Sequence, residues 1–547
     1  MSNKVLKVHP DDNVIVALQD IAKGETITFH NSALKIIDDI PAKHKFFDRD
    51  MNAGDEVIMY GVLVGKAQSF IPSGGLMTTT NIKHAAEHYD YRGSNFQWEA
   101  PDVSKFKNKT FNGYHRSDGR VGTANYWLFI PTVFCENRNL DVIREALHNE
   151  LGYAVTDKYK QYTHQLVEAH KKGEALNTID LSPSAFSKNC SRPFKNVDGI
   201  KFLNHQGGCG GIRQDAAILS KLLAAYADHP NVGGITVLSL GCQNLQVNDF
   251  VNDLKQRTAD FDKPLYIFEQ QQSLSEEQLI AEAIKKTFEG LVEINKQERK
   301  PASLDKLCVG VKCGGSDGFS GISANPAVGY CSDLLVALGA KVLLAEFPEL
   351  CGVEQEMVDR SVDEPTARKF MKLMKAYEEI VSRVGSGFHM NPSPGNIKDG
   401  LITDAIKSAG AAKKGGTSPV VDVLDYTEPA TKPGLSLVCT PGNDVEATTG
   451  KAASGATLIL FTTGLGTPTG NPVCPTIKVA TNSKLVKRMG DIIDIDTGAI
   501  IDGSKTIEQI GEEILEYCIK AASGEVIPKA VLLNQDDFIP WKRGVSL

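Results

Sequence analysis

The chain has 547 residues, of which 41% are hydrophobic and 23% charged, and its formal net charge is −8. This length exceeds what one hydrophobic core supports, so we expect about two to four domains. The acidic balance and the lack of a basic stripe argue against nucleic acid as a partner. No apolar run reaches the roughly 18 residues of a membrane helix, and the N-terminus lacks a secretory segment, so we expect a cytoplasmic protein with no membrane partner.

Residues 1–86 have the pattern of a small β-rich module. Short alternating runs at Asn13–Leu18, Glu25–Phe29 and Glu56–Leu63 are separated by glycine-containing turns, which predicts a β-clip or small barrel. Its histidines, His9 and His44, are either substrate or metal contacts or simply exposed polar residues.

Two further histidines, His84 and His88, lie four residues apart on a possible helix. That spacing suits a metal, but the sequence offers no third ligand beside them. The segment 87–110 is polar and aromatic without a period, and we interpret it as a linker.

Two α/β subdomains are predicted after the linker, at 111–303 and 304–547, divided near a charged connector at 293–303. Residues 150–196 are polar and helical, which indicates an insertion. Elsewhere buried strands alternate with helical stretches, as in parallel sheets of Rossmann-like subdomains.

Unusual polar and sulfur residues recur where the predicted strands end. These residues are Cys135 after Tyr126–Pro131, His205 and Cys209 after Ile200–Asn204, Cys242 after Ile235–Leu240, Cys313 after Leu307–Val311, and Glu346 and Glu349 after Val342–Ala345. Ligands bind outside the carboxyl ends of parallel strands. The repetition favours a binding or catalytic site over packing.

The stretch from Cys313 to Gly329 is a glycine-rich turn between a strand and a helix, with Asn325 as the expected N-cap and Pro326 at the first helical position. It brings backbone N–H groups, a thiol, the Ser316 hydroxyl and the Asp317 carboxylate to one sheet edge. Such a set suits a small anion or a metal. A tight structural turn is the alternative.

Phosphate-loop, dinucleotide, zinc-protease and serine-hydrolase motifs are absent. Eleven scattered cysteines without a Cys-x-x-Cys pair are not a disulfide framework. Thiols, carboxylates and glycine-rich loops remain, and these suit metal-assisted dehydration of a hydroxy acid. Glu346 or Glu349 would be a general base or a hard ligand, and thiolates favour iron, zinc or an iron–sulfur cluster.

Several motifs resemble the altronate/galactarate dehydratase family. His9-Pro-Asp-Asp-Asn-Val and Pro41–Lys45 resemble its N-terminal SAF domain. Cys313–Pro326, Asn391–Asn396 and Ile477–Asn482 resemble its catalytic signatures. The stretch Glu346-Phe-Pro-Glu349 is more similar to the altronate branch than to the galactarate branch.

The resemblance implies a hydro-lyase that depends on iron, as Fe²⁺ or as a cluster, and converts D-altronate to 2-dehydro-3-deoxy-D-gluconate and water in hexuronate catabolism. Galactarate or another aldonate or aldarate is the alternative substrate. Further alternatives are a sulfo-lyase acting on a sulfonated hydroxy acid and a sugar-acid-binding protein without activity. We expect the protein to form a homo-oligomer, most simply a dimer. Its other expected partner is the small-molecule sugar-acid substrate.

The resemblance also implies residue roles. As metal ligands it suggests Cys135, Cys209, Cys242 and Cys313; as catalytic residues Glu346, Glu349, His205 and Asp317; and as substrate contacts Ser316, Asn325, Asn396, Lys478, His9 and His44. The other seven cysteines, Cys351 among them, are expected to be structural.

Three positions depart from the family pattern. Leu465 replaces an arginine and Thr469 a tyrosine, so a carboxylate clamp is lost. Lys312 stands where acidic or amide residues are usual, and it would restore a positive charge near the site.

Overall fold

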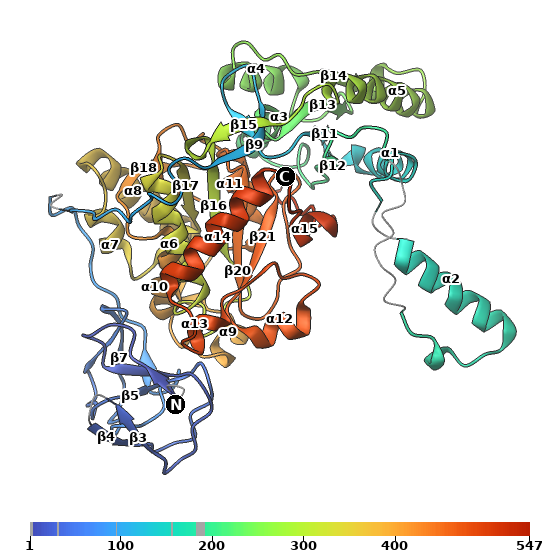
Figure 1. Ribbon diagram of the computed structural model, residues 1–547. Coiled ribbons are helices and arrows are strands. Elements are labelled where there is room, and N and C mark those ends of the chain that lie inside the picture. The colour runs from blue at the N-terminus through green and yellow to red at the C-terminus, as the bar shows by residue number, and fades with distance from the viewer. Residues whose placement is uncertain (1–3, 30–31, 94–95, 155–156, 182–191, 547) are drawn as a thin grey trace.

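The computed structural model describes residues 4–29, 32–93, 96–154, 157–181 and 192–546. A small β module, a four-stranded parallel sheet and a seven-stranded parallel sheet follow one another along the chain (Figure 1). The predicted α/β class with an N-terminal β module is therefore confirmed. Within the described ranges, none of the helices has the length and apolar character to cross a membrane.

The N-terminal module consists of three small antiparallel sheets. They contain β1 (Val5–Leu6), β2 (Val14–Ala17) and β5 (Lys45–Phe47); β3 (Thr26–Phe29) and β4 (Ser32–Lys35); and β6 (Glu56–Met59), β7 (Val62–Ala67) and β8 (Ile82–Lys83). The run predicted as one strand at Glu56–Leu63 is a hairpin. Tyr60 and Gly61 both have positive φ, 59° and 78°, the conformation that a two-residue turn between twisted strands requires.

Residues 84–109 form no helix or strand in their described part. The chain then enters a three-stranded antiparallel sheet of β10 (Val121–Gly122), β9 (Thr110–His115) and β15 (Lys300–Ser303). Because β9 and β15 lie at the start and end of the second domain, this sheet closes that domain on itself.

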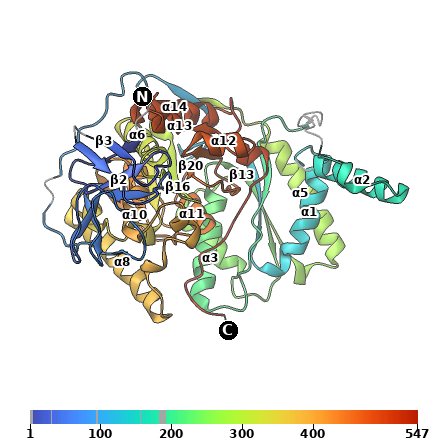
Figure 2. The same ribbon diagram turned by 90° about the horizontal axis from the view of Figure 1, so that it is seen from below.

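The second domain is built on four parallel strands in the order β12 (Gly199–Phe202), β11 (Tyr126–Pro131), β13 (Val232–Ser239) and β14 (Leu265–Glu269). Its long helices are α1 (Asn137–Glu150), α3 (Arg213–Asp228), α4 (Val247–Arg257) and α5 (Glu276–Ile294). The predicted helical insertion contains α2 (Asp157–Lys172), which projects from the body in both views (Figures 1 and 2).

The third domain has seven parallel strands in the order β18 (Val420–Leu424), β19 (Gly434–Val438), β17 (Lys341–Ala345), β16 (Cys308–Cys313), β20 (Leu458–Thr463), β21 (Thr476–Ala480) and β22 (Ile495–Asp496). Strands β16, β19, β20 and β21 are buried along their whole length, as parallel strands covered on both faces are. The chain adds strands on one side of β16 and then on the other, so the topological switch point lies between β16 and β20.

Helices cover this sheet on both faces. The helices of the third domain are α6 (Ala324–Ala337), α7 (Glu354–Asp359), α8 (Glu364–Arg383), α9 (Pro394–Lys398), α10 (Asp404–Ala412), α11 (Asp444–Ala453), α12 (Ser483–Met489), α13 (Gly498–Ile501), α14 (Ile507–Ala522) and α15 (Lys529–Leu532). Helix α6 begins two residues earlier than predicted, because Ser323, not Asn325, is the N-cap residue. The Ser323 hydroxyl donates to the carbonyls of Phe319 and Thr481, which holds the preceding turn in place.

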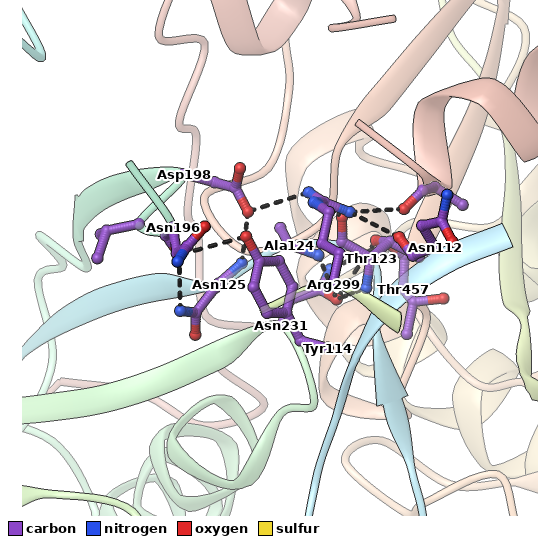
Figure 3. A network of polar contacts seen from close by, with 12 residues as sticks. Asn112, Tyr114, Thr123, Ala124, Asn125, Asn196, Asp198, Asn231, Arg299 and Thr457 are labelled. Carbon is purple, nitrogen blue, oxygen red and sulfur yellow. Dashed lines mark hydrogen bonds and ion pairs between the residues drawn. The ribbon is translucent and has the colours of Figure 1, made fainter. Parts of the chain in front are cut away.

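A polar network joins the second and third domains (Figure 3). Arg299 donates to the carbonyl of Ala522 at 2.8 Å and to the Asp198 carboxylate at 3.1 Å. Asn231 Nδ2 donates to the carbonyl of Thr457 at 3.0 Å. These contacts satisfy buried polar groups between the two sheets and so hold the domains in one arrangement.

Candidate active site

The predicted glycine-rich loop lies at the switch point of the seven-stranded sheet. Strand β16 ends at Cys313, and the next two residues are Gly314 and Gly315. A Cβ atom on Gly314 would lie 2.4 Å from an Asp444 oxygen. Gly315 has φ +58°, and its carbonyl accepts the N–H groups of Gly464 and Leu465, both at 3.0 Å. Glycine is needed here because the loops after β16 and β20 touch.

A buried cluster of lysines, carboxylates and one thiol lies beside this loop. Lys414 Nζ lies 2.8 Å from Cys313 Sγ and 3.4 Å from Glu346 Oε2. Lys312 is paired with Glu346 and lies 3.0 Å from Asp444 Oδ1. Charges so deeply buried are stable only when they are paired in this way.

Glu349 completes the cluster on the other side of the thiol. Its Oε2 lies 3.4 Å from Cys313 Sγ, and its Oε1 accepts an ion pair from Lys407 at 2.9 Å. Burial by itself would raise the pKa of Glu349, but Lys407, Lys312 and Lys414 hold it well below its usual value. Burial raises the pKa of the Cys313 thiol, against the opposing effect of Lys414. Glu349 is therefore ionised at neutral pH.

Glu346 is held in an unusual backbone conformation. It follows β17 with φ 75° and ψ 61°, in the left-handed region that non-glycine residues seldom occupy. Its N–H donates to Thr440 Oγ1 at 3.1 Å. Strain of this kind persists where the surrounding structure fixes a side chain for a function.

Lys451 of α11 is buried with no hydrogen-bond partner for its Nζ in the described structure. Its side chain packs along Gly310 of β16, where an added Cβ would meet Lys451 Cδ at 3.1 Å. Burial lowers the pKa of Lys451 to about 8. A lysine with such a pKa exchanges a proton near neutral pH.

The N-terminal module contributes directly to the site. Lys43 Nζ lies 3.1 Å from Asp317 Oδ2 and 3.0 Å from Asp399 Oδ1, and the carbonyl of Lys43 fits against Gly318 and Gly400, where a Cβ would come within 2.5 Å of it. The module thereby covers the glycine-rich loop.

The two module histidines predicted to contact substrate differ in position. His44 is next to Lys43, half-buried, with its Nδ1 3.3 Å from the carbonyl of Ala42, and burial lowers its pKa. His9 lies on a turn of the module against Gly61, its Nδ1 3.6 Å from Asp11. The side-chain contacts of both histidines thus stay inside the module, but the backbone of His44 lies against Gly400, where an added Cβ would meet its nitrogen at 3.4 Å.

Asp317 is buried and accepts hydrogen bonds from Ser320, Thr481 and Asn482. These bonds, with the Lys43 ion pair, fix its carboxylate beside the β20 and β21 loops.

Three other predicted substrate contacts are engaged within the protein. Asn396 Nδ2 donates to the carbonyl of Ser316 at 2.8 Å. The amide of Asn325 donates to the carbonyl of Gly410 and accepts from Thr462 Oγ1, so it positions α10 and β20. Lys478 Nζ donates to the carbonyl of Thr467 at 2.6 Å, and burial lowers the pKa of Lys478 to about 8.

The other predicted residues gather at the carboxyl edge of the four-stranded sheet. Cys135, Cys209 and Cys242 follow β11, β12 and β13, and all three are exposed. Their loops meet at two glycines: Phe134 N–H donates to the carbonyl of Gly207 at 3.1 Å, and Asn244 N–H to that of Gly208 at 2.9 Å.

His205 supports this edge from below. It is buried, its Nε2 lies 2.8 Å from the carbonyl of Pro131, and its Nδ1 accepts the N–H of Gly207 at 3.0 Å. Burial lowers the pKa of His205 to about 4, so it is neutral and positions the loop that carries Cys209.

Two groups of three or more potential metal ligands lie within 4.8 Å of one another in the described residues. One is Cys313 with Glu346 and Glu349; the other is His84 with Cys351 and Asp404. The structure thus separates Cys313 from the other three cysteines of the expected metal set, which belong to a different sheet.

The two places differ in how well they fit iron. At Cys313, every donor already contacts an ammonium group, Lys414, Lys312 or Lys407, and these positive charges oppose a metal cation. At the other edge, the side-chain contact found for the three sulfurs in the described chain is Gln271 Nε2, 3.2 Å from Cys242. The three exposed thiols have the ligand chemistry of iron or an iron–sulfur cluster, but their sulfur atoms do not form a group within 4.8 Å of one another in the described structure.

Lys407, Lys414 and Lys451 were not found from the sequence. They lie on α10, η7 (Lys413–Gly415) and α11, in segments that read as ordinary helices or surface turns. Only Lys414, directly before Gly415 and Gly416, stands in a composition that marks a turn near a ligand.

A parallel α/β sheet with such a polar cluster at its switch point is the arrangement of an enzyme that binds a small, anionic, polar substrate. Three family profiles match the chain: the altronate/galactarate dehydratase SAF domain over residues 3–85, the D-galactarate dehydratase/altronate hydrolase second domain over 113–295, and the D-galactarate/altronate dehydratase C-terminal domain over 304–546.

Whole proteins match as well. The chain is 32% identical to the altronate dehydratases of Bacillus subtilis and of Escherichia coli, each over 99% of both chains. It is 31% identical to the galactarate dehydratase (L-threo-forming) of Escherichia coli over 95% of this chain and 93% of that protein. The chain therefore belongs to the altronate/galactarate dehydratase family, and it is a hydro-lyase.

Proposed function

We propose that this enzyme dehydrates D-altronate to 2-dehydro-3-deoxy-D-gluconate. The C2 proton is removed, the C3 hydroxyl leaves with a proton as water, and the resulting enol becomes the 2-keto acid. The observation that carries the proposal is the buried group of Lys312, Lys407 and Lys414 around Glu346, Glu349 and Cys313 at the switch point.

The lysines suit both the substrate and the intermediate. A proton next to a carboxylate is weakly acidic, and its removal places a second negative charge on that end of the molecule. Ammonium groups fixed in a site without bulk water stabilise this developing charge strongly. Lys407, whose side chain is 11% exposed, is the lysine best placed to meet the substrate carboxylate.

Glu349 is our candidate for the base. In the free enzyme its pKa is held low, chiefly by Lys407 against the effect of burial, so it is a weak base. A substrate carboxylate that takes over Lys407 would release Glu349 from this ion pair and raise its basicity. The general base would then gain strength only when substrate is bound.

We further propose that Cys135, Cys209 and Cys242 hold iron, alone or in a cluster. Bound there, iron would supply a Lewis acid that polarises a hydroxyl group. The chain's own contribution at this edge is to hold three thiols on converging loops, with His205 fixing the loop of Cys209.

A panel assay tests the proposal. Protein purified without oxygen and loaded with iron is offered aldonates, aldarates and sulfolactate, and 2-keto acid formation is measured. We expect the highest kcat/KM with D-altronate. If only galactarate or only sulfolactate is turned over, that compound replaces D-altronate as the assigned substrate. If no compound is turned over, the proposed dehydratase function is wrong.

A further inference from the structure

The second cluster of potential ligands lies where the N-terminal module meets the third domain. Its members come from three separate parts of the chain: His84 directly after β8, Cys351 after η5 (Phe347–Leu350), and Asp404 at the first residue of α10. One nitrogen, one sulfur and one oxygen lie within 4.8 Å of one another. The fold thus provides two further ligands for His84, and His88, the residue paired with it by sequence spacing, is not among them.

We propose that His84, Cys351 and Asp404 bind a divalent transition-metal ion of the zinc class, which fastens the N-terminal module to the catalytic domain. The contacts already bring the donors together: His84 Nδ1 is paired with Asp404 Oδ1, and Cys351 Sγ lies 3.8 Å from Asp404 Oδ2. Donor atoms around a tetrahedral zinc ion are about 3.5 Å apart. Small side-chain rotations are enough to reach that geometry.

The local charge supports a cation. Asp404 is 3% exposed and Glu354, the next acid beside the cluster, is 7% exposed. Within 4.0 Å, neither carboxylate forms an ion pair with a lysine or arginine of the described residues. Glu349, five residues before Glu354, is by contrast paired with Lys407. Asp404 has the His84 imidazole as its ion-pair partner, and Glu354 has none in the described residues. A buried carboxylate with so little compensation is costly, and a metal ion would lower that cost.

A second buried carboxylate, that of Glu354, lies beside the three donors. A metal ion would favour the thiolate and carboxylate forms of these groups. Glu354, whose Oε2 accepts the Gly352 N–H at 2.6 Å, or a water molecule would take the fourth position.

The ligand types select the metal. Imidazole and thiolate favour zinc or ferrous iron over magnesium and calcium, which prefer oxygen ligands only. With one ligand directly after the module's last strand and another at the start of α10, the ion would hold the module over the glycine-rich loop that Lys43 also contacts. The site is separate from the three exposed cysteines and from Cys313.

The first test counts metal ions. Chelator-treated protein is equilibrated with Zn²⁺ and the bound equivalents are measured for the wild type, His84→Ala, Cys351→Ser and the control His88→Ala, whose histidine is exposed four residues away. We expect His84→Ala and Cys351→Ser each to lose one equivalent and His88→Ala to lose none. Equal stoichiometry in all four proteins would overturn the proposal.

The second test uses only the wild-type protein and so does not depend on how a variant folds. The rate of alkylation at Cys351 is followed by peptide mass spectrometry with and without Zn²⁺. We expect zinc to slow the reaction at Cys351 at least tenfold, and an unchanged rate would refute binding. Neither test measures turnover. The proposal of this metal site is therefore tested independently of the proposed dehydratase activity.

Discussion

The ammonium group of Lys414 lies 2.8 Å from Cys313 Sγ and 3.4 Å from Glu346 Oε2. One lysine thus joins the strand-end thiol of β16 to the carboxylate that follows β17. All three side chains are buried, so removal of the lysine leaves the Cys313 thiol without its ammonium partner and leaves Glu346 with Lys312 as its remaining ion pair.

Lys414→Met should be strongly impaired in both stability and activity. Breaking a buried ion pair costs about 3–5 kcal/mol, and kcat should fall at least a hundredfold. Lys413→Met is the matched control, since Lys413 precedes it in the same turn but is only half-buried. Thermal unfolding and 2-keto acid formation measure the two effects. Similar losses in both variants would contradict the assignment.

Glu349→Gln should lower kcat by about 10²–10⁴-fold, the range for loss of a general base. The same substitution should also change how the free energy of unfolding falls at acidic pH. The folded-state pKa of Glu349 is below its usual value of 4.5, so its ionised form stabilises the fold above that value and this stabilisation is lost as pH falls. Denaturant unfolding measured from pH 7 down to pH 3 should show a shallower decline for Glu349→Gln. If the stability of Glu349→Gln falls with pH as steeply as that of the wild type, Glu349 is not ionised in the folded protein.

Lys451→Met should stabilise the protein near pH 7. The pKa of Lys451 is lowered by burial from 10.5 to about 8, a difference that corresponds to roughly 3 kcal/mol. The unfolded chain therefore binds more protons than the folded one between these two values, and wild-type stability rises with pH across that window. The gain from Lys451→Met should be largest below pH 8 and vanish above pH 10.5. Lys484→Met, at an exposed lysine, should show no such pH dependence.

Cys209→Ser and Cys313→Ser should separate iron binding from the chemistry at the switch point. If the exposed cysteines hold iron, Cys209→Ser loses both iron and activity. Cys313→Ser should keep its iron and lose most of its turnover, because its sulfur contacts Lys414 and Glu349 instead. Iron analysis with absorption spectroscopy distinguishes the two variants. Loss of iron in Cys313→Ser would show that the Cys313 thiol is an iron ligand after all.

Leu465→Arg should change substrate preference. Leu465 N–H bonds to the carbonyl of Gly315, next to the catalytic loop, and Arg488 of α12 donates to the carbonyl of Leu465 at 3.0 Å. A guanidinium at position 465 adds a bidentate hydrogen-bond donor for a carboxylate. The KM for a dicarboxylate such as galactarate should therefore fall relative to the KM for altronate. Leu465→Met is the neutral control. No change in the ratio of kcat/KM values would show that this loop does not contact the substrate.

Much of the architecture could be read from local pattern. The strands that end at Cys313 and near Glu346 are continuous apolar runs, and buried parallel strands have that pattern in any sequence. The glycines after Cys313 mark a close approach of loops, and the Asp444 carboxylate beside Gly314 provides it. By contrast, the hairpin at Tyr60 and Gly61 was hidden inside one apolar run, because Tyr60 is a residue typical of strands and Gly61 alone marks the turn.

The sequence by itself determined the parallel sheets, the β module and the strand ends at which polar groups accumulate, since these depend on hydrophobic period and turn chemistry over short distances. Only the tertiary structure decided which of those ends face one another. It placed Lys407, Lys414 and Lys451 around Glu346 and Glu349, separated Cys313 from the three exposed cysteines, and brought Cys351 to His84 across 267 residues. Charge pairing and ligand geometry act through space, and no local pattern records which distant side chains will share a site.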